Sequence, residues 1–246
     1  MSGHSKWSTI KRKKGAQDVK RSATFSKLAR LIQVAARNGS DPEMNFRLKL
    51  AVQKAREANM PNSNIERAIS KGSGTGKDAE VIEEVRYEGL ALGNVGLVIE
   101  VLTDNKNRTV SDLRNIFNKN GGAFGTSTAW QFETKGVIEL AKGGSTEAAE
   151  LAIIDSGATD FEDTGETFEV YTAPKELDIV RSKLETAGLV VKSTALELVP
   201  KHKTVISDAA LAKRILSFLN TLEEHDDVVN VYSTLEVPDA ILNQIS

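Results

Sequence analysis

Apolar residues recur every three to four positions over residues 17–37, which is the spacing of an amphipathic helix. This apolar face consists of Phe25, Leu28, Leu31, Ile32, Ala35 and Ala36. Asp41-Pro42 is a strong helix start, and the pattern after it predicts a second helix to about residue 58. A third helix is expected over residues 63–72, opened by a capping box at Ser63–Glu66. The first third of the chain therefore predicts a small three-helix domain.

From about residue 85 the spacing changes to a mixture of strands and helices. One set of segments lies in the middle of the remainder, with strands at 137–140, 159–163, 166–172 and 189–198 and helices at 146–156 and 174–187. A second set flanks it, with strands at 95–102, 128–133, 203–206 and 228–235 and helices at 107–119 and 208–222. Each set has the order β-α-β-β-α-β, which is typical of a ferredoxin-like domain.

The predicted fold class is therefore α+β and multidomain. A basic helical domain with an N-terminal arm is assigned to 1–79. A discontinuous ferredoxin-like domain covers 80–133 and 200–246, and a second ferredoxin-like domain, 134–199, is inserted into it. The glycine-rich stretch at 72–77 lacks the spacing of a phosphate-binding loop and follows a helix rather than a strand, so we expect a linker there.

Charge is distributed unevenly along the chain, although the net charge of the whole is only −2. Residues 1–77 hold 17 Lys and Arg against 5 Asp and Glu, whereas the other 169 residues hold 15 against 29. The N-terminal third is thus +12 and the remainder −14. Such an asymmetry favours a polyanionic partner for the basic part, and the alternative is a basic surface that only balances the acidic body.

The candidate nucleic-acid-binding surface has two parts, a basic arm before the first helix and a cationic stripe on that helix. It consists of Lys6, Trp7, Lys11, Arg12, Lys13, Lys14, Lys20, Lys27, Arg30 and Arg37. The indole of Trp7 either stacks on an unpaired base or docks onto the protein. A helix-turn-helix centred on Asn59–Asn62 is disfavoured as a sequence reader, because the helix after it is barely two turns long.

A second polar segment, Thr103–Thr109, joins a predicted strand to a helix start, where free N–H groups and the helix dipole favour an anion. Its candidate anion-binding residues are Asn105, Asn107 and Arg108. The alternative is a helix cap made by Asn107 or Thr109, with Asp112 completing a capping box.

Little in the sequence points to catalysis. The cluster Glu223–Asp227, which contains His225, either binds a divalent cation through its carboxylates or forms an exposed acidic turn. There is no Cys, no zinc motif and no nucleophile elbow, so no catalytic residue, resident metal or cofactor is predicted. No apolar run approaches 18 residues, so we expect no membrane partner.

Several blocks spread over the whole chain resemble the YebC/PmpR family. They are Ser2–Trp7, Lys11–Lys14, Ala35–Arg37, Asp41-Pro42, Asn59–Pro61, Asn64–Ala68, Tyr87–Gly89, Leu102–Thr109, Gly121-Gly122 and Gly125-Thr126. The resemblance implies a cytoplasmic protein of one basic helical domain and two α/β domains. Family members are described as probable DNA-binding transcriptional regulators, and mitochondrial relatives as translational activators at the ribosome. Two blocks depart from the family pattern, Leu90–Asn94 and Asn45-Phe46.

The sequence thus predicts a non-enzymatic regulator of gene expression that binds nucleic acid through its basic N-terminal domain. RNA or the ribosome is the favoured target, because the acidic domains repel a long duplex and no convincing helix for major-groove reading is present. The alternatives are a DNA-binding transcriptional regulator and an interaction module whose acidic domains dock basic proteins.

Overall fold

The structure is a computed structural model that describes residues 17–74, 82–143 and 146–245, with side chains from Thr24 onward. The chain folds into two compact units. The inserted unit comprises Trp130–Lys203 with Thr234–Glu236, and the main unit comprises the described parts of the rest. The predicted α+β class is confirmed, with helices first and antiparallel sheets after them. Within the described ranges no helix has both the length and the apolar character to cross a membrane.

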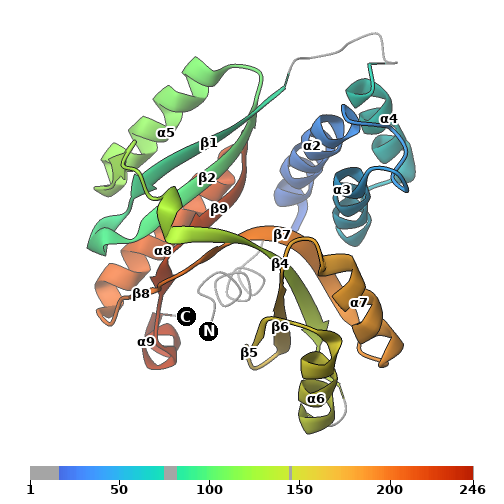
Figure 1. Cartoon of the computed structure of the whole chain (residues 1–246). Helices are drawn as coiled ribbons and strands as arrows, with labels where there is room; N and C mark the ends of the chain where they lie inside the picture. The colour runs from blue at the N-terminus through green and yellow to red at the C-terminus, as the bar shows by residue number, and fades with distance from the viewer. Residues whose placement is uncertain (1–16, 75–81, 144–145, 246) are drawn as a thin grey trace. The chain divides into compact units, whose positions relative to one another are not determined.

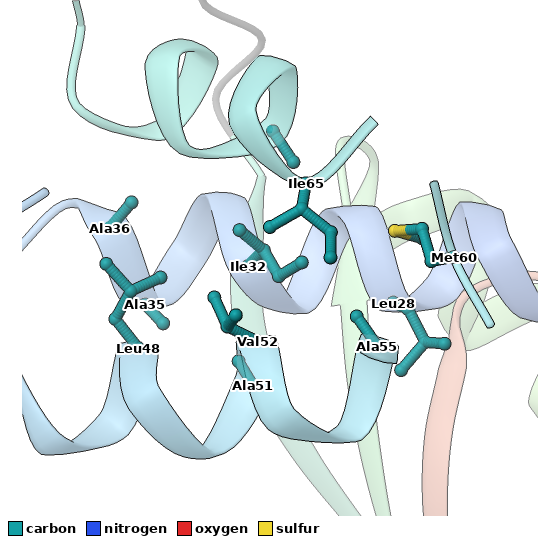
Figure 2. Close-up of a cluster of buried hydrophobic side chains, with 11 residues drawn as sticks. Leu28, Ile32, Ala35, Ala36, Leu48, Ala51, Val52, Ala55, Met60 and Ile65 are labelled. Carbon is teal, nitrogen blue, oxygen red and sulfur yellow. The ribbon is translucent and has the colours of Figure 1, made fainter. Parts of the chain in front are cut away.

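Three helices form a helical module at the start of the main unit, namely α2 (Gln17–Ala36), α3 (Phe46–Glu57) and α4 (Asn62–Gly72) (Figure 1). Their apolar faces meet in one core, because the spacing of three to four residues places those side chains on one side of each helix. The buried members of this core are Leu28, Ile32, Ala35, Ala36, Leu48, Ala51, Val52, Ala55, Met60, Ile65 and Ala68 (Figure 2).

Two of the predicted helix starts were wrong. The second helix begins at Phe46, since Asn45 is its N-cap and accepts a hydrogen bond from the Leu48 N–H at 3.1 Å. The Asp41-Pro42 pair lies in the turn before it. The third helix begins one residue after Pro61, and no side chain caps it, so the predicted Ser63–Glu66 capping box does not form.

Asn45 also joins the end of α2 to the start of α3. Its side-chain N–H groups donate to the carbonyl oxygens of Ala35 and Gly39, each at 2.8 Å. We expect Asn45→Ala to lower the free energy of unfolding by about 1–2 kcal/mol, because one cap and two further hydrogen bonds are lost. Urea denaturation followed by circular dichroism measures this change. An Asn45→Asp variant keeps the cap but not the two donors, so its free energy of unfolding should lie between those of the parent protein and Asn45→Ala.

The sheet of the main unit has the order β3-β1-β2-β9, and neighbouring strands are antiparallel. Its strands are β1 (Glu83–Leu90), β2 (Gly96–Thr103), β3 (Ala123–Phe124) and β9 (Val228–Ser233). Its two long helices are α5 (Lys106–Asn120) and α8 (Ala209–Glu224). Phe117 of α5 and Phe218 of α8 meet edge to face, with 5.0 Å between ring centroids, so these helices pack side by side. Shorter elements of the main unit are η1 (Leu92–Asn94), β8 (Thr204–Val205) and α9 (Asp239–Ile245), whereas β10 (Leu235–Glu236) belongs to the inserted unit.

The strands of this sheet are not the four that the sequence predicts. Its order is β-β-α-β-α-β, because β1 belongs to it and the segments 128–133 and 203–206 do not. Residues 128–133 instead contain the 3-10 turn η2 (Ala129–Gln131) and the first residues of the next strand. β1 was not predicted, because its residues are mostly polar. It forms a strand through pairing with β2 along all eight residues.

The elements of the inserted unit follow each other in the order β-α-β-β-α-β. Its elements are β4 (Phe132–Ala141), α6 (Thr146–Ser156), β5 (Asp160–Asp163), β6 (Thr167–Thr172), α7 (Leu177–Thr186) and β7 (Val191–Pro200). The antiparallel sheet has the ferredoxin-like order β5-β6-β4-β7. Apolar residues of both helices pack on the sheet. The fully buried residues of this core are Ile138, Leu140 and Val170 of the sheet and Ile153, Leu177 and Leu184 of the helices.

In the main unit, α2 is buried on a second side as well. Val34 packs with Ile82 and with Leu102 of β2, and the half-buried Leu31 adjoins this small cluster. The side of α2 that faces away from α3 and α4 therefore lies against the sheet and is not a free surface along this stretch.

Candidate nucleic-acid interface

The structure describes only part of the predicted binding surface. The arm residues Lys6, Trp7 and Lys11–Lys14 lie outside the described residues, and so does the side chain of Lys20. Of the remaining stripe, Arg37 is exposed at the end of α2. Lys27 and Arg30 lie on the side of α2 that also carries Val34.

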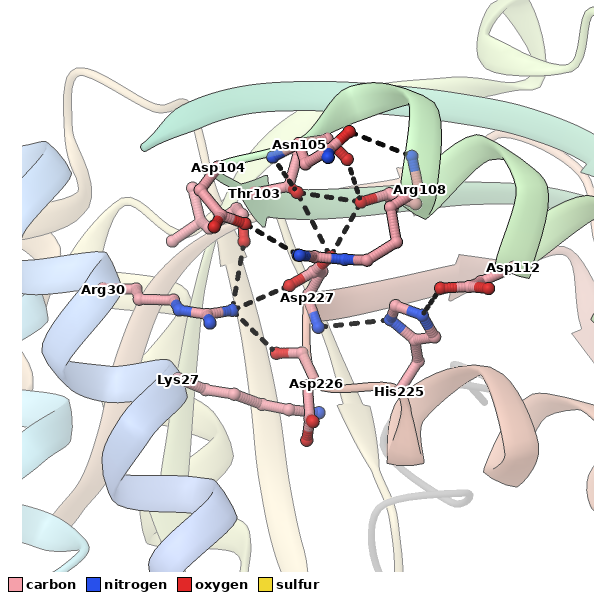
Figure 3. Close-up of polar contacts among 12 residues, drawn as sticks. Lys27, Arg30, Thr103, Asp104, Asn105, Arg108, Asp112, His225, Asp226 and Asp227 are labelled. Atoms are coloured by element: carbon pink, nitrogen blue, oxygen red, sulfur yellow. Dashed lines mark hydrogen bonds and ion pairs between the residues drawn. The ribbon is translucent and has the colours of Figure 1, made fainter. Parts of the chain in front are cut away.

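Lys27 and Arg30 contact acceptors of their own chain, and Figure 3 draws the contacts of Arg30. The ammonium of Lys27 donates to the carbonyl oxygen of Glu223 at 2.5 Å. The guanidinium of Arg30 donates to the Asp227 carboxylate at 2.9 Å and lies 3.4 Å from the carbonyl oxygen of Asp226. These two stripe residues thus join α2 to the turn between α8 and β9.

Asp227 is the centre of this polar network. Its side chain is only 3% exposed, yet it accepts a hydrogen bond from the Thr109 hydroxyl at 2.7 Å and one from the Thr103 hydroxyl at 3.2 Å. Arg108 adds an ion pair at 3.2 Å. Burial raises the pKa of Asp227, but the hydrogen bonds from Thr109, Arg108, Arg30 and Thr103 outweigh burial, so this pKa lies below its ordinary value of 3.8. The network therefore holds a buried carboxylate in its charged form.

The Thr103–Thr109 loop contacts this same carboxylate. Asn105 is the N-cap of α5 and accepts from the Arg108 N–H at 3.1 Å, so the cap is neither Asn107 nor Thr109, the two residues that the capping alternative named. Arg108 is paired with Asp104 at 2.7 Å as well as with Asp227. The anion that this loop contacts in the structure is thus a side chain of the same protein.

The acidic cluster at the end of α8 forms the turn into β9. The Asp227 N–H donates to Nδ1 of His225 at 3.2 Å, which leaves the proton on Nε2, and Nε2 lies 3.4 Å from the Asp112 carboxylate. Asp112 therefore contacts His225 and does not complete a capping box. Among the described residues, no group of three or more His, Asp or Glu side chains is placed to hold a metal ion.

Five cations of the helical module make no ion pair or side-chain hydrogen bond to another described residue. They are Arg37, Lys54, Arg56, Arg67 and Lys71. Of these only Arg37 belongs to the predicted stripe. Lys54 and Arg56 lie on α3, and Arg67 and Lys71 lie on α4, for which the sequence analysis predicted no binding role. Arg67 and Lys71 are four residues apart on one helix, so they lie on the same face of it. This spacing could have indicated a cationic surface on α4 from the sequence alone.

Comparisons with known proteins agree over nearly the whole chain. The model of the TACO1/YebC protein N-terminal domain matches residues 5–75, and the model of the TACO1/YebC second and third domain matches residues 82–235. A probable transcriptional regulatory protein of Rubrobacter xylanophilus is similar at 49% identity over 100% of both chains. A protein of the same description from Pelotomaculum thermopropionicum is 46% identical over 97% of this chain and 100% of its own.

A solved structure agrees with the fold as well. The crystal structure of a conserved hypothetical protein from Aquifex aeolicus superposes with a TM-score of 0.82 at 42% identity. The match covers 90% of this chain and 93% of that one.

Proposed function

Since the chain belongs to the TACO1/YebC family, we propose that it is a non-enzymatic regulator of gene expression that binds nucleic acid through its basic N-terminal part. The description of its relatives as probable transcriptional regulatory proteins supports a regulatory role. The observation that carries nucleic-acid binding is the charge of +12 over residues 1–77. The five unpaired cations of the helical module support it, because such charges are free to neutralise phosphates.

The binding surface in this proposal is the arm together with the unpaired cations of the helical module. In the arm, the residues that contact phosphates are Lys6, Lys11, Arg12, Lys13 and Lys14. The indole of Trp7 stacks on an unpaired base. Lys20 and Arg37 extend the surface onto α2. Lys27 and Arg30 act mainly in packing α2 on the sheet, because their donors already have acceptors in the protein.

Structured RNA, such as that of the ribosome, is the favoured target in this proposal. Residues 134–199 hold 13 acids against 6 bases, so a long duplex that reaches them meets repulsion within about one Debye length, about 8 Å at physiological salt. An irregular RNA surface accepts the basic module and leaves the acidic parts outside, where they are free to meet basic proteins. A DNA-binding transcriptional regulator is the second candidate, which the name of the relatives favours.

Competition titrations decide between these two candidates. The full chain is titrated into a labelled structured RNA at physiological salt, and unlabelled RNA or random duplex DNA is added as competitor. We expect RNA to compete several times better than duplex DNA. Equal competition by duplex DNA, or tight selection of one DNA sequence, contradicts the RNA proposal and supports a transcription factor.

Binding is expected to weaken steeply with salt. If four to six phosphates are neutralised, the logarithm of the association constant should fall against the logarithm of the salt concentration with a slope of about −3 to −5, because bound counterions are released. Fluorescence anisotropy with a labelled RNA from about 50 to 200 mM salt measures this slope. An association constant that does not change over this range would remove the electrostatic basis of the proposal.

A further inference from the structure

A groove between α2 and α4 lies within the helical module and is separate from the Asp227 network. Its volume is about 370 Å³, near the lower end of the range for small-ligand pockets, about 300–1,000 Å³. This is room for one planar ring system and not for a folded element. The lining residues are Phe25, Ser26, Ala29, Gln33, Met60, Asn64, Arg67, Ala68 and Lys71.

The groove has an apolar part and a polar part. Met60, labelled in Figure 2, is 5% exposed and Ala68 is 2% exposed, and both belong to the module's core. The half-buried ring of Phe25 packs beside them. The amides of Gln33 and Asn64 make no hydrogen bond to another described side chain or backbone group. Each amide offers both a donor and an acceptor, which is what the edge of a nucleobase requires.

The charge of the groove is entirely positive. Arg67 and Lys71 lie one turn apart on α4, no carboxylate is among the lining residues, and neither cation pairs with another described residue. Two unpaired cations beside an apolar surface complement a ligand that has an apolar flat part and a negative part. A nucleotide has this combination, with its base for the apolar surface and its phosphates for the cations.

Close packing fixes the distance between the two helices that form the groove. A Cβ atom on Gly72, at the end of α4, would lie 2.2 Å from the carbonyl oxygen of Gln33, so only glycine permits this approach. The backbone contact thus fixes the spacing of α2 and α4 at one end of the groove.

We propose that this groove binds one unstacked nucleobase of the RNA, with the adjoining phosphates on Arg67 and Lys71. The proposal rests on the proposed function, and it specifies what part of the RNA the helical module recognises. A base inside a regular helix is stacked on its neighbours and cannot enter, whereas a bulged or looped base can. The groove thus gives the protein a preference for RNA that presents an unpaired base.

The test uses two RNA hairpins, one with a single bulged 2-aminopurine and one fully paired. The full chain should bind the bulged hairpin about fivefold or more tightly, since stacking of a single base on an aromatic ring contributes an effect of at least this size. The 2-aminopurine fluorescence should change on binding. Asn64→Ala and Lys71→Gln should remove most of the preference. Ala29→Leu should do the same by filling the groove without changing its charge.

Lys54→Gln is the matched control, because Lys54 is an unpaired cation on α3 and does not line the groove. It should weaken binding of both hairpins equally and leave the preference intact. Circular dichroism of each variant checks that the helices are still formed. If Ala29→Leu fails this check, Asn64→Ala and Lys71→Gln carry the test alone.

Two results overturn the groove proposal without affecting the proposed function: equal binding of both hairpins, or groove variants that behave as Lys54→Gln does. If the full chain binds neither hairpin, the proposed function fails as well. A labelled oligoglutamate peptide that binds more tightly than the bulged RNA, and loses affinity in Ala29→Leu, assigns the groove to acidic peptides instead.

Discussion

Asp227→Ala is expected to lower the free energy of unfolding by about 2–4 kcal/mol. The substitution leaves Arg30, Arg108 and two threonine hydroxyls without their common acceptor. Most of this cost arises at the buried end of the network, where Thr103 and Thr109 lose their acceptor. Arg30 and Arg108 add less, because both are partly exposed and keep Asp226 and Asp104 as acceptors. Urea denaturation at pH 7 measures the loss. Asp226→Ala is the matched control, since its exposed side chain lies one residue away, and it should change stability by less than about 0.5 kcal/mol.

The same variant should show a defined pH dependence. The folded-state pKa of Asp227 lies below the ordinary value of 3.8, so its contribution is fully present above about pH 4. It is lost as the pH falls through the folded-state pKa. The stability difference between the parent protein and Asp227→Ala should therefore be constant from pH 7 to about pH 5 and shrink below pH 3.8. A difference no larger than that of Asp226→Ala at every pH would show that the network contributes nothing to stability.

Neutralising the arm is expected to have the largest effect on binding. With glutamine at Lys11, Arg12, Lys13 and Lys14, affinity for structured RNA should fall about 100-fold at low salt, and the salt slope should fall to half or less, since each lost phosphate contact removes about one unit. The free energy of unfolding of the same variant serves as the control, since a loss of affinity without a loss of stability assigns the effect to binding. Fluorescence anisotropy and urea denaturation of the same samples measure both quantities.

The Lys27→Gln/Arg30→Gln double variant is the comparison that separates binding from packing. Both side chains contact acceptors of the main unit, so this variant should lose stability by about 1–3 kcal/mol and keep most of its affinity for RNA. If the double variant loses affinity for RNA and keeps its stability, Lys27 and Arg30 belong to the binding surface instead.

Periodicity alone was enough to predict the inserted unit and the three helices, since buried apolar faces determine both. The resemblance to the YebC family is likewise confirmed by matches along the whole chain. The predicted stripe on α2 overlooked Val34, which lies on the same side of the helix as Lys27 and Arg30. An apolar residue within a cationic face is a sign that this face is covered, and the sequence contains that sign.

Two other features are beyond prediction from local pattern. β1 is mostly polar, and its pairing with β2 on one side and β3 on the other makes it a strand. Asp227 lies within an acidic run that suggests an exposed turn, whereas its donors come from positions up to 197 residues away in the sequence. The sequence offers no local signal for such a distant set of partners, so the role of Asp227 in packing became apparent only from the structure.

The position of β9 in the sheet has a consequence for the order of events during synthesis. β2 is almost entirely buried, and β9, which covers one of its edges, follows the inserted unit in the sequence. A growing chain can complete the helical module and the four-stranded sheet of the inserted unit while β2 still presents an open, apolar edge. Until β9 leaves the ribosome, the nascent chain has a complete helical module beside an incomplete sheet. During this time the open edge of β2 can pair with a strand of another incomplete chain, which leads to aggregation.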